Sequence, residues 1–188
     1  MNKRHRIFIA INLPNDQKKY LAGFEKKWAD VPAKWTTLDN IHMTLLFLGD
    51  LTDVELGQVC QISKEVLEKY NSFHINLSKV AYGPEGKIPP RYIWVGGEQI
   101  KELSVLKKDL QDALSEKINF ILDHKAFSPH ITLARIKEWE WRVIEPDQRP
   151  EVNEHIEMMF TVESIEVMES ELTRQGPRYT VIESYQLK

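Results

Sequence analysis

A His-x-Thr-Leu tetrad occurs once in each half of this chain. The two copies are His42-Met43-Thr44-Leu45 and His130-Ile131-Thr132-Leu133. Each copy lies in a run that is apolar at every other position, which is typical of a β-strand with one buried face. Within each predicted strand, the imidazole and the hydroxyl two residues later share a face. The pattern therefore predicts two strands that each present one histidine and one threonine together.

Strict alternation also assigns the neighbouring side chains. We expect Met43, Leu45 and Phe47 on the face opposite His42, Thr44 and Leu46, and Ile131 and Leu133 on the face opposite His130, Thr132 and Ala134. Phe8 and Phe47 are then expected in the core. A single His-x-Thr is most often only the polar outer face of a strand. Two copies, each followed by leucine, favour a functional pair.

Length and composition describe an ordinary globular protein. The chain has 188 residues, of which 42% are hydrophobic and 28% charged, and this length supports a substantial core. Its one cysteine, Cys60, excludes an intramolecular disulfide and a zinc site built from several cysteines. The net charge of −3 argues against a broad electrostatic grip on long nucleic acid. This net charge is compatible with binding of a single phosphate or of a chain end by a few arginines.

The N-terminus does not fit a secretion signal. The basic segment Met1–Arg6 precedes an apolar run, Ile7–Ile11, that is too short and is followed by Asn12 instead of a small-residue cleavage site. No other apolar run approaches the length that spans a bilayer. We expect a cytoplasmic, monomeric protein with no membrane partner.

The remaining pattern alternates strands with helices. Predicted strands are residues 6–12, 40–50, 73–80, 91–95, the second His strand, 162–168 and 179–187, and predicted helices run from Pro14 to about Ala29, from a capping box at Thr52 and Glu55, and over 100–114. Gly and Pro residues at 82–90 mark the best boundary between halves. Residues 137–157 show no confident periodicity.

In both halves the predicted order is a strand, a helix and then the strand that carries the His-x-Thr-Leu tetrad. This order indicates an internal repeat. We therefore expect one domain over residues 1–188 with halves of roughly 1–82 and 90–188, and exchange of segments between them stays open. If the halves pair about a pseudo-twofold axis, the two His strands face one groove.

Such a groove suits phosphoryl chemistry. Histidine titrates near neutrality, so one imidazole serves as base while the other serves as acid. Each threonine hydroxyl donates to a phosphate oxygen. The chain has no metal-binding spacing such as H-E-x-x-H, and we expect no metal and no cofactor.

At this level of detail the chain resembles the two-histidine (2H) phosphoesterases. Within them it is most similar to the LigT/ThpR branch, the RNA 2′,3′-cyclic phosphodiesterases once described as 2′-5′ RNA ligases. The segments that carry this resemblance are Arg6–Pro14, Asn40–Asp50, Arg91–Gly96, Phe127–Arg135 and Arg178–Thr180.

The resemblance implies an α+β, bilobal LigT-like fold in which two pseudo-symmetric lobes with antiparallel sheets surround a central cleft and the helices lie outside. It implies metal-independent hydrolysis of a terminal RNA 2′,3′-cyclic phosphate to a 2′-phosphate, on substrates that include tRNA fragments, with reverse 2′-5′ ligation as a side activity. By analogy, His130 is the proton acceptor and His42 the proton donor, while Thr44 and Thr132 hold the phosphate. The residues themselves do not distinguish acid from base.

Further site residues are implied less directly. Arg135 matches a phosphate-binding arginine, although strict alternation turns it away from His130 unless a twist or strand end restores it; a surface arginine is the alternative. Arg91 and Trp94 match positions near the nucleotide, where an aromatic ring stacks on a base, and a core tryptophan is equally compatible. Arg178 either meets the phosphate or caps its loop.

Two other functions stay open at this stage. One is a 2H phosphodiesterase for another substrate, such as 2′,5′-oligonucleotides or ADP-ribose cyclic phosphate. The other is a module that binds RNA ends without turnover, although binding alone needs no acid and base.

Overall fold

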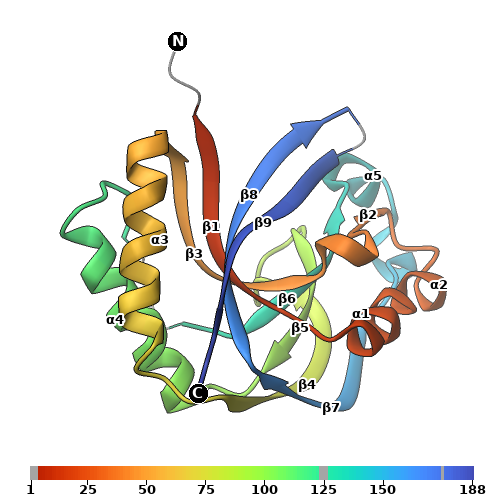
Figure 1. The fold of residues 1–188 in the computed structure, drawn as a ribbon. Coiled ribbons are helices and arrows are strands. Elements are labelled where there is room, and N and C mark those ends of the chain that lie inside the picture. The colour runs from red at the N-terminus through yellow and green to blue at the C-terminus, as the bar shows by residue number, and fades with distance from the viewer. Residues whose placement is uncertain (1–3, 123–126, 175) are drawn as a thin grey trace.

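Two antiparallel β-sheets and the helices that flank them build the fold (Figure 1). The computed structural model describes residues 4–122, 127–174 and 176–188. Sheet A has the strand order β3-β1-β8-β9, formed by His42–Leu51, His5–Asn12, Ser164–Thr173 and Gly176–Gln186. Sheet B has the order β2-β6-β5-β4-β7, formed by Ala33–Trp35, His130–Ile136, Tyr92–Gly97, Phe73–Gly83 and Asn153–Val162. The predicted α+β class with antiparallel sheets is confirmed.

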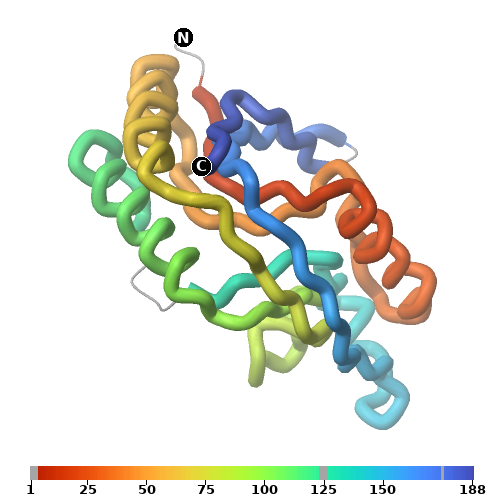
Figure 2. The backbone as a smooth tube through the Cα atoms, turned by 60° about the horizontal axis from the view of Figure 1, so that its bottom comes forward, coloured from red at the N-terminus to blue at the C-terminus, as the bar shows by residue number. Residues whose placement is uncertain are grey.

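The longer helices cover one side of the molecule. Helix α3 (Asp53–Leu67) lies beside α4 (Lys101–Ser115) and contacts β1, β3 and β9 (Figures 1 and 2). The predicted capping box begins α3, because the Thr52 hydroxyl accepts from the Glu55 backbone N–H and the Glu55 carboxylate accepts from the Thr52 N–H. The shorter helices are α1 (Asn15–Ala22), α2 (Phe24–Lys27) and α5 (Glu138–Arg142), with 3₁₀ turns η1 (Leu38–Asn40) and η2 (Pro146–Gln148).

The core joins both sheets to these helices. Ile7, Ile9 and Ile11 of β1 belong to one cluster with Leu103 and Leu110 of α4. Burying each such side chain contributes about 1.5–3 kcal/mol relative to leaving it exposed. The other face of β1 is also covered, since Phe8 and Ala10 pack with Met168 and the partly buried Tyr179. Strand β1 is therefore anchored on both faces, and it holds β3 in place.

The chain passes repeatedly between the sheets. Sheet A pairs β1 and β3 with the late strands β8 and β9, while sheet B takes β2 and β4 from the first half. The loop after Gly83 joins β4 to β5, two neighbouring strands of sheet B. This loop contains most of the segment from which the sequence predicts the boundary between halves.

Several elements differ from the sequence-based expectations, and three of these differences are instructive. The helix predicted over residues 14–29 is two short helices with Gly23 between them, where glycine is a weak helix former. Strand β3 continues past Gly49, which adopts a φ of 80° that favours glycine. Strand β7 was not predicted. It is an edge strand that pairs, within the described residues, with β4 alone, and its exposed positions are Asn153, His155, Glu157 and Met159, which do not alternate cleanly with apolar residues.

Candidate active site

Both histidines stand at the first residue of a strand. His42 begins β3, an edge strand of sheet A, and His130 begins β6, which lies between β2 and β5 in sheet B. The two strands come from different sheets and contact each other. The four tetrad positions that carry His or Thr are half-buried, and the residues between them are buried. This confirms the predicted pairing of imidazole and hydroxyl on one face within each strand.

A β-bulge interrupts each His strand at the leucine of its tetrad. In β3, Thr44 pairs with Ala10 and Leu46 pairs with Ile9, which leaves Leu45 as the extra residue. In β6, Thr132 pairs with Trp94 and Ala134 pairs with Ile93, which leaves Leu133 as the extra residue. A bulge reverses the alternation beyond it. The two strands therefore carry the same irregularity at equivalent positions.

These bulges correct one expectation and resolve another. Leu46 is buried and Phe47 is 68% exposed, so the prediction that Phe47 belongs to the core was wrong. Phe47 lies on the face of His42, paired with Phe8 at a ring distance of 6.1 Å. Ala134 is likewise buried and Arg135 exposed. Arg135 thus shares the face of His130 and Thr132, which strict alternation did not allow.

The His42 ring is held at both nitrogens. Its Nδ1–H donates to the Asn40 carbonyl at 2.7 Å, since a carbonyl only accepts, and its Nε2 lies 2.9 Å from the Thr44 hydroxyl. In the neutral ring this arrangement leaves Nε2 as the acceptor. The rings of Phe8 and Tyr179 flank the imidazole, each with a centroid distance of 5.1 Å.

Burial lowers the pKa of His42. The nearby charge of Lys18 lowers this pKa further, while the hydrogen bond to the Asn40 carbonyl opposes the change. Burial acts in this direction because it disfavours the charged form of the ring. His42 is therefore neutral at pH 7 in the free protein.

The His130 ring has an equivalent backbone contact and a different aromatic neighbour. Its Nδ1–H donates to the Ser128 carbonyl at 2.8 Å, as His42 donates to the carbonyl two residues before it. The Trp94 ring lies 4.1 Å from the imidazole and stacks on Tyr92 at 5.7 Å. Trp94 is half-buried and lies outside the main core cluster. It forms a platform beside His130.

Gly83 makes room for this platform. A Cβ atom built on Gly83 would lie 2.3 Å from a carbon of the Trp94 ring, closer than carbon atoms approach without displacement. The absence of a side chain at residue 83 therefore lets the indole lie against the backbone of β4.

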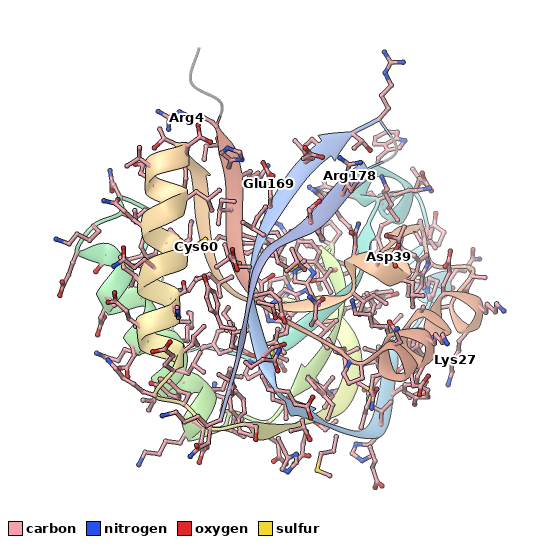
Figure 3. The ribbon with its side chains drawn as sticks, in the orientation of Figure 1. Arg4, Lys27, Asp39, Cys60, Glu169 and Arg178 are labelled. Atoms are coloured by element: carbon pink, nitrogen blue, oxygen red, sulfur yellow. The ribbon has the colours of Figure 1, made fainter. Side chains whose placement is uncertain are left out.

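The two remaining candidate arginines differ in their surroundings. Arg91 is exposed and directly precedes β5, where its carbonyl accepts from the Ile136 backbone N–H. Arg178 lies on the β8–β9 hairpin (Figure 3), and its guanidinium pairs with the Glu171 carboxylate. Arg178 therefore already has an anionic partner in the protein.

Sequence reasoning missed Tyr179 as a neighbour of His42. It lies on β9, far away in sequence, and packs edge-on against both His42 and Phe8. Burial raises the pKa of Tyr179, with the charge of Arg6 opposing the rise, so its hydroxyl is protonated at neutral pH. The only signal in the sequence was its place in the Arg178–Thr180 segment.

Over the described residues, the helices include none with the length and apolar character needed to cross a bilayer.

The sequence is similar to that of known phosphoesterases along most of its length. The family model for LigT like Phosphoesterase matches residues 10–94 and again residues 95–179. An RNA 2′,3′-cyclic phosphodiesterase of Aquifex aeolicus is 32% identical over 165 residues, which cover 84% of this chain and 83% of that protein. A protein of the same name from Thermotoga maritima is 29% identical over 183 residues, which cover 94% and 92%.

Solved structures agree in fold. A crystal structure of a Thermus thermophilus protein superposes with a TM-score of 0.83 at 28% identity, covering 97% of each chain. Escherichia coli LigT complexed with 3′-AMP gives a TM-score of 0.79 at 20% identity, covering 99% of each chain. These matches confirm the predicted LigT-like fold. Since the family model matches both halves, each with its own His-x-Thr-Leu strand, the chain belongs to the LigT-like phosphoesterase family of 2H phosphoesterases.

Proposed function

We propose that this chain is an RNA 2′,3′-cyclic phosphodiesterase that opens a terminal cyclic phosphate to a 2′-phosphate. The observation that carries the proposal is the matched orientation of the two imidazoles. Each Nδ1–H is held by a backbone carbonyl two residues earlier, so each Nε2 is the nitrogen left to exchange a proton. The names of the Aquifex and Thermotoga relatives support the same substrate.

In the proposed reaction, His130 accepts a proton from water as the water oxygen attacks phosphorus. The bond from phosphorus to O3′ breaks, and His42 donates its proton to that oxygen. Thr44 and Thr132 donate to the non-bridging oxygens, and Arg135, on the His130 face, balances their growing charge. No metal ion takes part in these steps.

The acid role of His42 requires a protonated imidazole, whereas burial and Lys18 lower its pKa in the free protein. The bound phosphodiester carries a negative charge, and an opposite charge nearby favours the imidazolium. Substrate binding therefore raises the pKa of His42 and prepares the proton donor. In the free protein the Thr44 hydroxyl is hydrogen-bonded to Nε2 of His42. When substrate binds, this hydroxyl turns to the phosphate.

The proposal extends to the setting of the reaction. The chain acts as a monomer and as one bilobal domain in the cytoplasm, on RNA fragments, including those of tRNA, that end in a cyclic phosphate. Arg91, Trp94 and Arg178 contact the terminal nucleotide; Arg178 must first exchange its contact with Glu171. The reverse reaction joins RNA through a 2′,5′ linkage as a weak side activity.

Hydrolysis of a short oligonucleotide ending in 2′,3′-cyclic phosphate, with EDTA present, tests the proposal. The expected product is the 2′-phosphate isomer alone, formed at the same rate with and without chelator. A matched reaction on a 2′,3′-cyclic mononucleotide shows whether RNA beyond the terminal nucleotide contributes. Loss of turnover on chelation contradicts the mechanism, and tight binding of the end without turnover contradicts the enzyme assignment.

A further inference from the structure

A buried lysine lies near the His42 site and exchanges no proton in the reaction described above. Lys18, on α1, is only 9% exposed, whereas lysine is almost never fully buried without a partner. Its ammonium donates to the Asn12 side-chain oxygen at 3.1 Å, the one hydrogen bond that it makes to the described part of the chain. An ammonium has three N–H donors, so two remain for solvent or a bound anion.

Asn12 ties this ammonium to the His42 strand. It ends β1 and pairs with His42 in the antiparallel register, so the two residues are direct cross-strand neighbours. Its backbone N–H donates to Glu166 at 3.1 Å, and its side-chain amide points toward the sulfur of Met168 at 4.0 Å. Met168 packs with Phe8 on the face that carries His42. The Asn12 side chain is therefore fixed on that face.

The ionisable groups near Lys18 come from three further elements. Burial lowers the pKa of Lys18, while the charges of Asp39 of η1 (Figure 3) and Glu166 of β8 oppose this change. His42 of β3 is the third group, and the charge of Lys18 lowers the pKa of that imidazole. Glu166 is already supplied with donors, since it accepts from Asn12 and from the hydroxyls of Ser164 and Ser184.

We infer that Lys18 is a positioning residue of the active site, which orients Asn12 beside His42 and whose charge draws an anionic phosphate to that side. The inference rests on the proposed function for its substrate. Lys18 places a cation on the His42 side of the site, as Arg135 does on the His130 side. Burial lowers the pKa of His42 and the charge of Lys18 adds to this effect, so that anion binding and protonation of His42 are coupled.

A structural role is the competing explanation, in which Lys18 only balances the buried Glu166. The two accounts differ in what they predict for His42. A structural role changes stability alone, whereas the inferred role also changes the titration of His42 and the affinity for phosphate.

The test uses K18M, which keeps the length of the side chain and removes its charge, and K18Q, which keeps a donor for Asn12. Lys19→Met is the matched control, because Lys19 is the exposed neighbouring residue on the same helix. The imidazole of His42 is titrated by NMR, and the affinity for inorganic phosphate is measured by calorimetry at constant ionic strength. Neither readout depends on turnover. A wild type that fails to hydrolyse cyclic phosphate therefore refutes the proposed function, and the two readouts still decide the inference about Lys18.

We expect K18M and K18Q to raise the titration midpoint of His42 by about half a unit or more and to weaken phosphate binding about threefold or more. The K19M control leaves both values at those of the wild type. In an active enzyme, the limb of the pH profile that belongs to His42 moves to higher pH in K18M. A thermal melt first shows whether each variant is folded. If K18M does not fold, K18Q is measured in its place. An unchanged His42 midpoint together with unchanged phosphate affinity in the folded variant overturns the inference.

Discussion

Replacing Gly83 with alanine tests how closely the Trp94 platform is fitted to its sheet. The added Cβ would lie 2.3 and 2.4 Å from two carbons of the Trp94 ring, whereas carbon atoms pack best at about 3.5–4.0 Å. The indole, or the strand beneath it, must therefore move by more than about 1 Å. Overpacking of this kind costs about 1–3 kcal/mol, which corresponds to a melting temperature lower by roughly 2–12 °C for a chain of this size.

Activity should fall more than stability suggests, because the displaced ring lies 4.1 Å from the His130 imidazole. A misplacement of about 1 Å near reacting groups costs up to about a hundredfold in rate. Thermal denaturation and turnover of a cyclic-phosphate oligonucleotide measure the two effects, and tryptophan fluorescence follows the ring.

Gly57→Ala is the matched control. Gly57 lies within α3, and a Cβ built there has no atom within 4 Å. Alanine should stabilise this helix by about 0.5–1 kcal/mol and leave activity unchanged. If G83A keeps the wild-type melting temperature and rate, the platform is not tightly fitted and its role beside His130 is refuted.

Three further predictions concern stability, binding and titration. Thr52→Ala removes the capping box of α3 and should lower the free energy of unfolding by about 1 kcal/mol, as measured in urea; no change would mean that the Thr52 side chain does not stabilise α3. Phe47→Ala should change that free energy by less than about 0.5 kcal/mol, because the side chain is exposed, while KM for an oligonucleotide rises severalfold if the ring stacks on a base; an unchanged KM refutes the stacking. The folded-state pKa of His42 lies below the unfolded value, so the unfolded chain binds the proton first and His42 reduces stability as pH falls through about 6.5. Denaturation of His42→Gln at several pH values should show a weaker loss in acid, and an identical pH dependence would contradict the depressed pKa.

The local chemistry of the site was predictable because it follows from strand periodicity. The shared face of His42 and Thr44, and that of His130 and Thr132, depends only on a spacing of two residues. The capping box at Thr52 and the helix over 100–114 likewise rest on contacts within one or two turns. These are the parts of the fold that neighbouring residues determine.

The other features of the site could not be predicted, because they depend on strand irregularities and on contacts between distant parts of the chain. The bulges at Leu45 and Leu133 turn Phe47 and Arg135 onto the active face, and strict alternation cannot reveal an inserted residue. Tyr179 approaches the His42 site from β9, a strand far away in the chain. Lys18 contacts Asn12, six residues earlier, and only the pairing of β1 with β3 brings Asn12 beside His42. The fit of Gly83 under Trp94 likewise exists only once β4 and β5 are paired.

In the proposed mechanism the two histidines act as one unit on one phosphate. The most direct test compares His42→Ala, His130→Ala and the double variant in hydrolysis of an oligonucleotide that ends in 2′,3′-cyclic phosphate. Each single variant should lose about a hundredfold or more in kcat, and the double variant should lose little beyond the worse single variant, because groups that act together are not additive. Losses that multiply in the double variant, or a single variant that keeps wild-type turnover, would contradict a shared site.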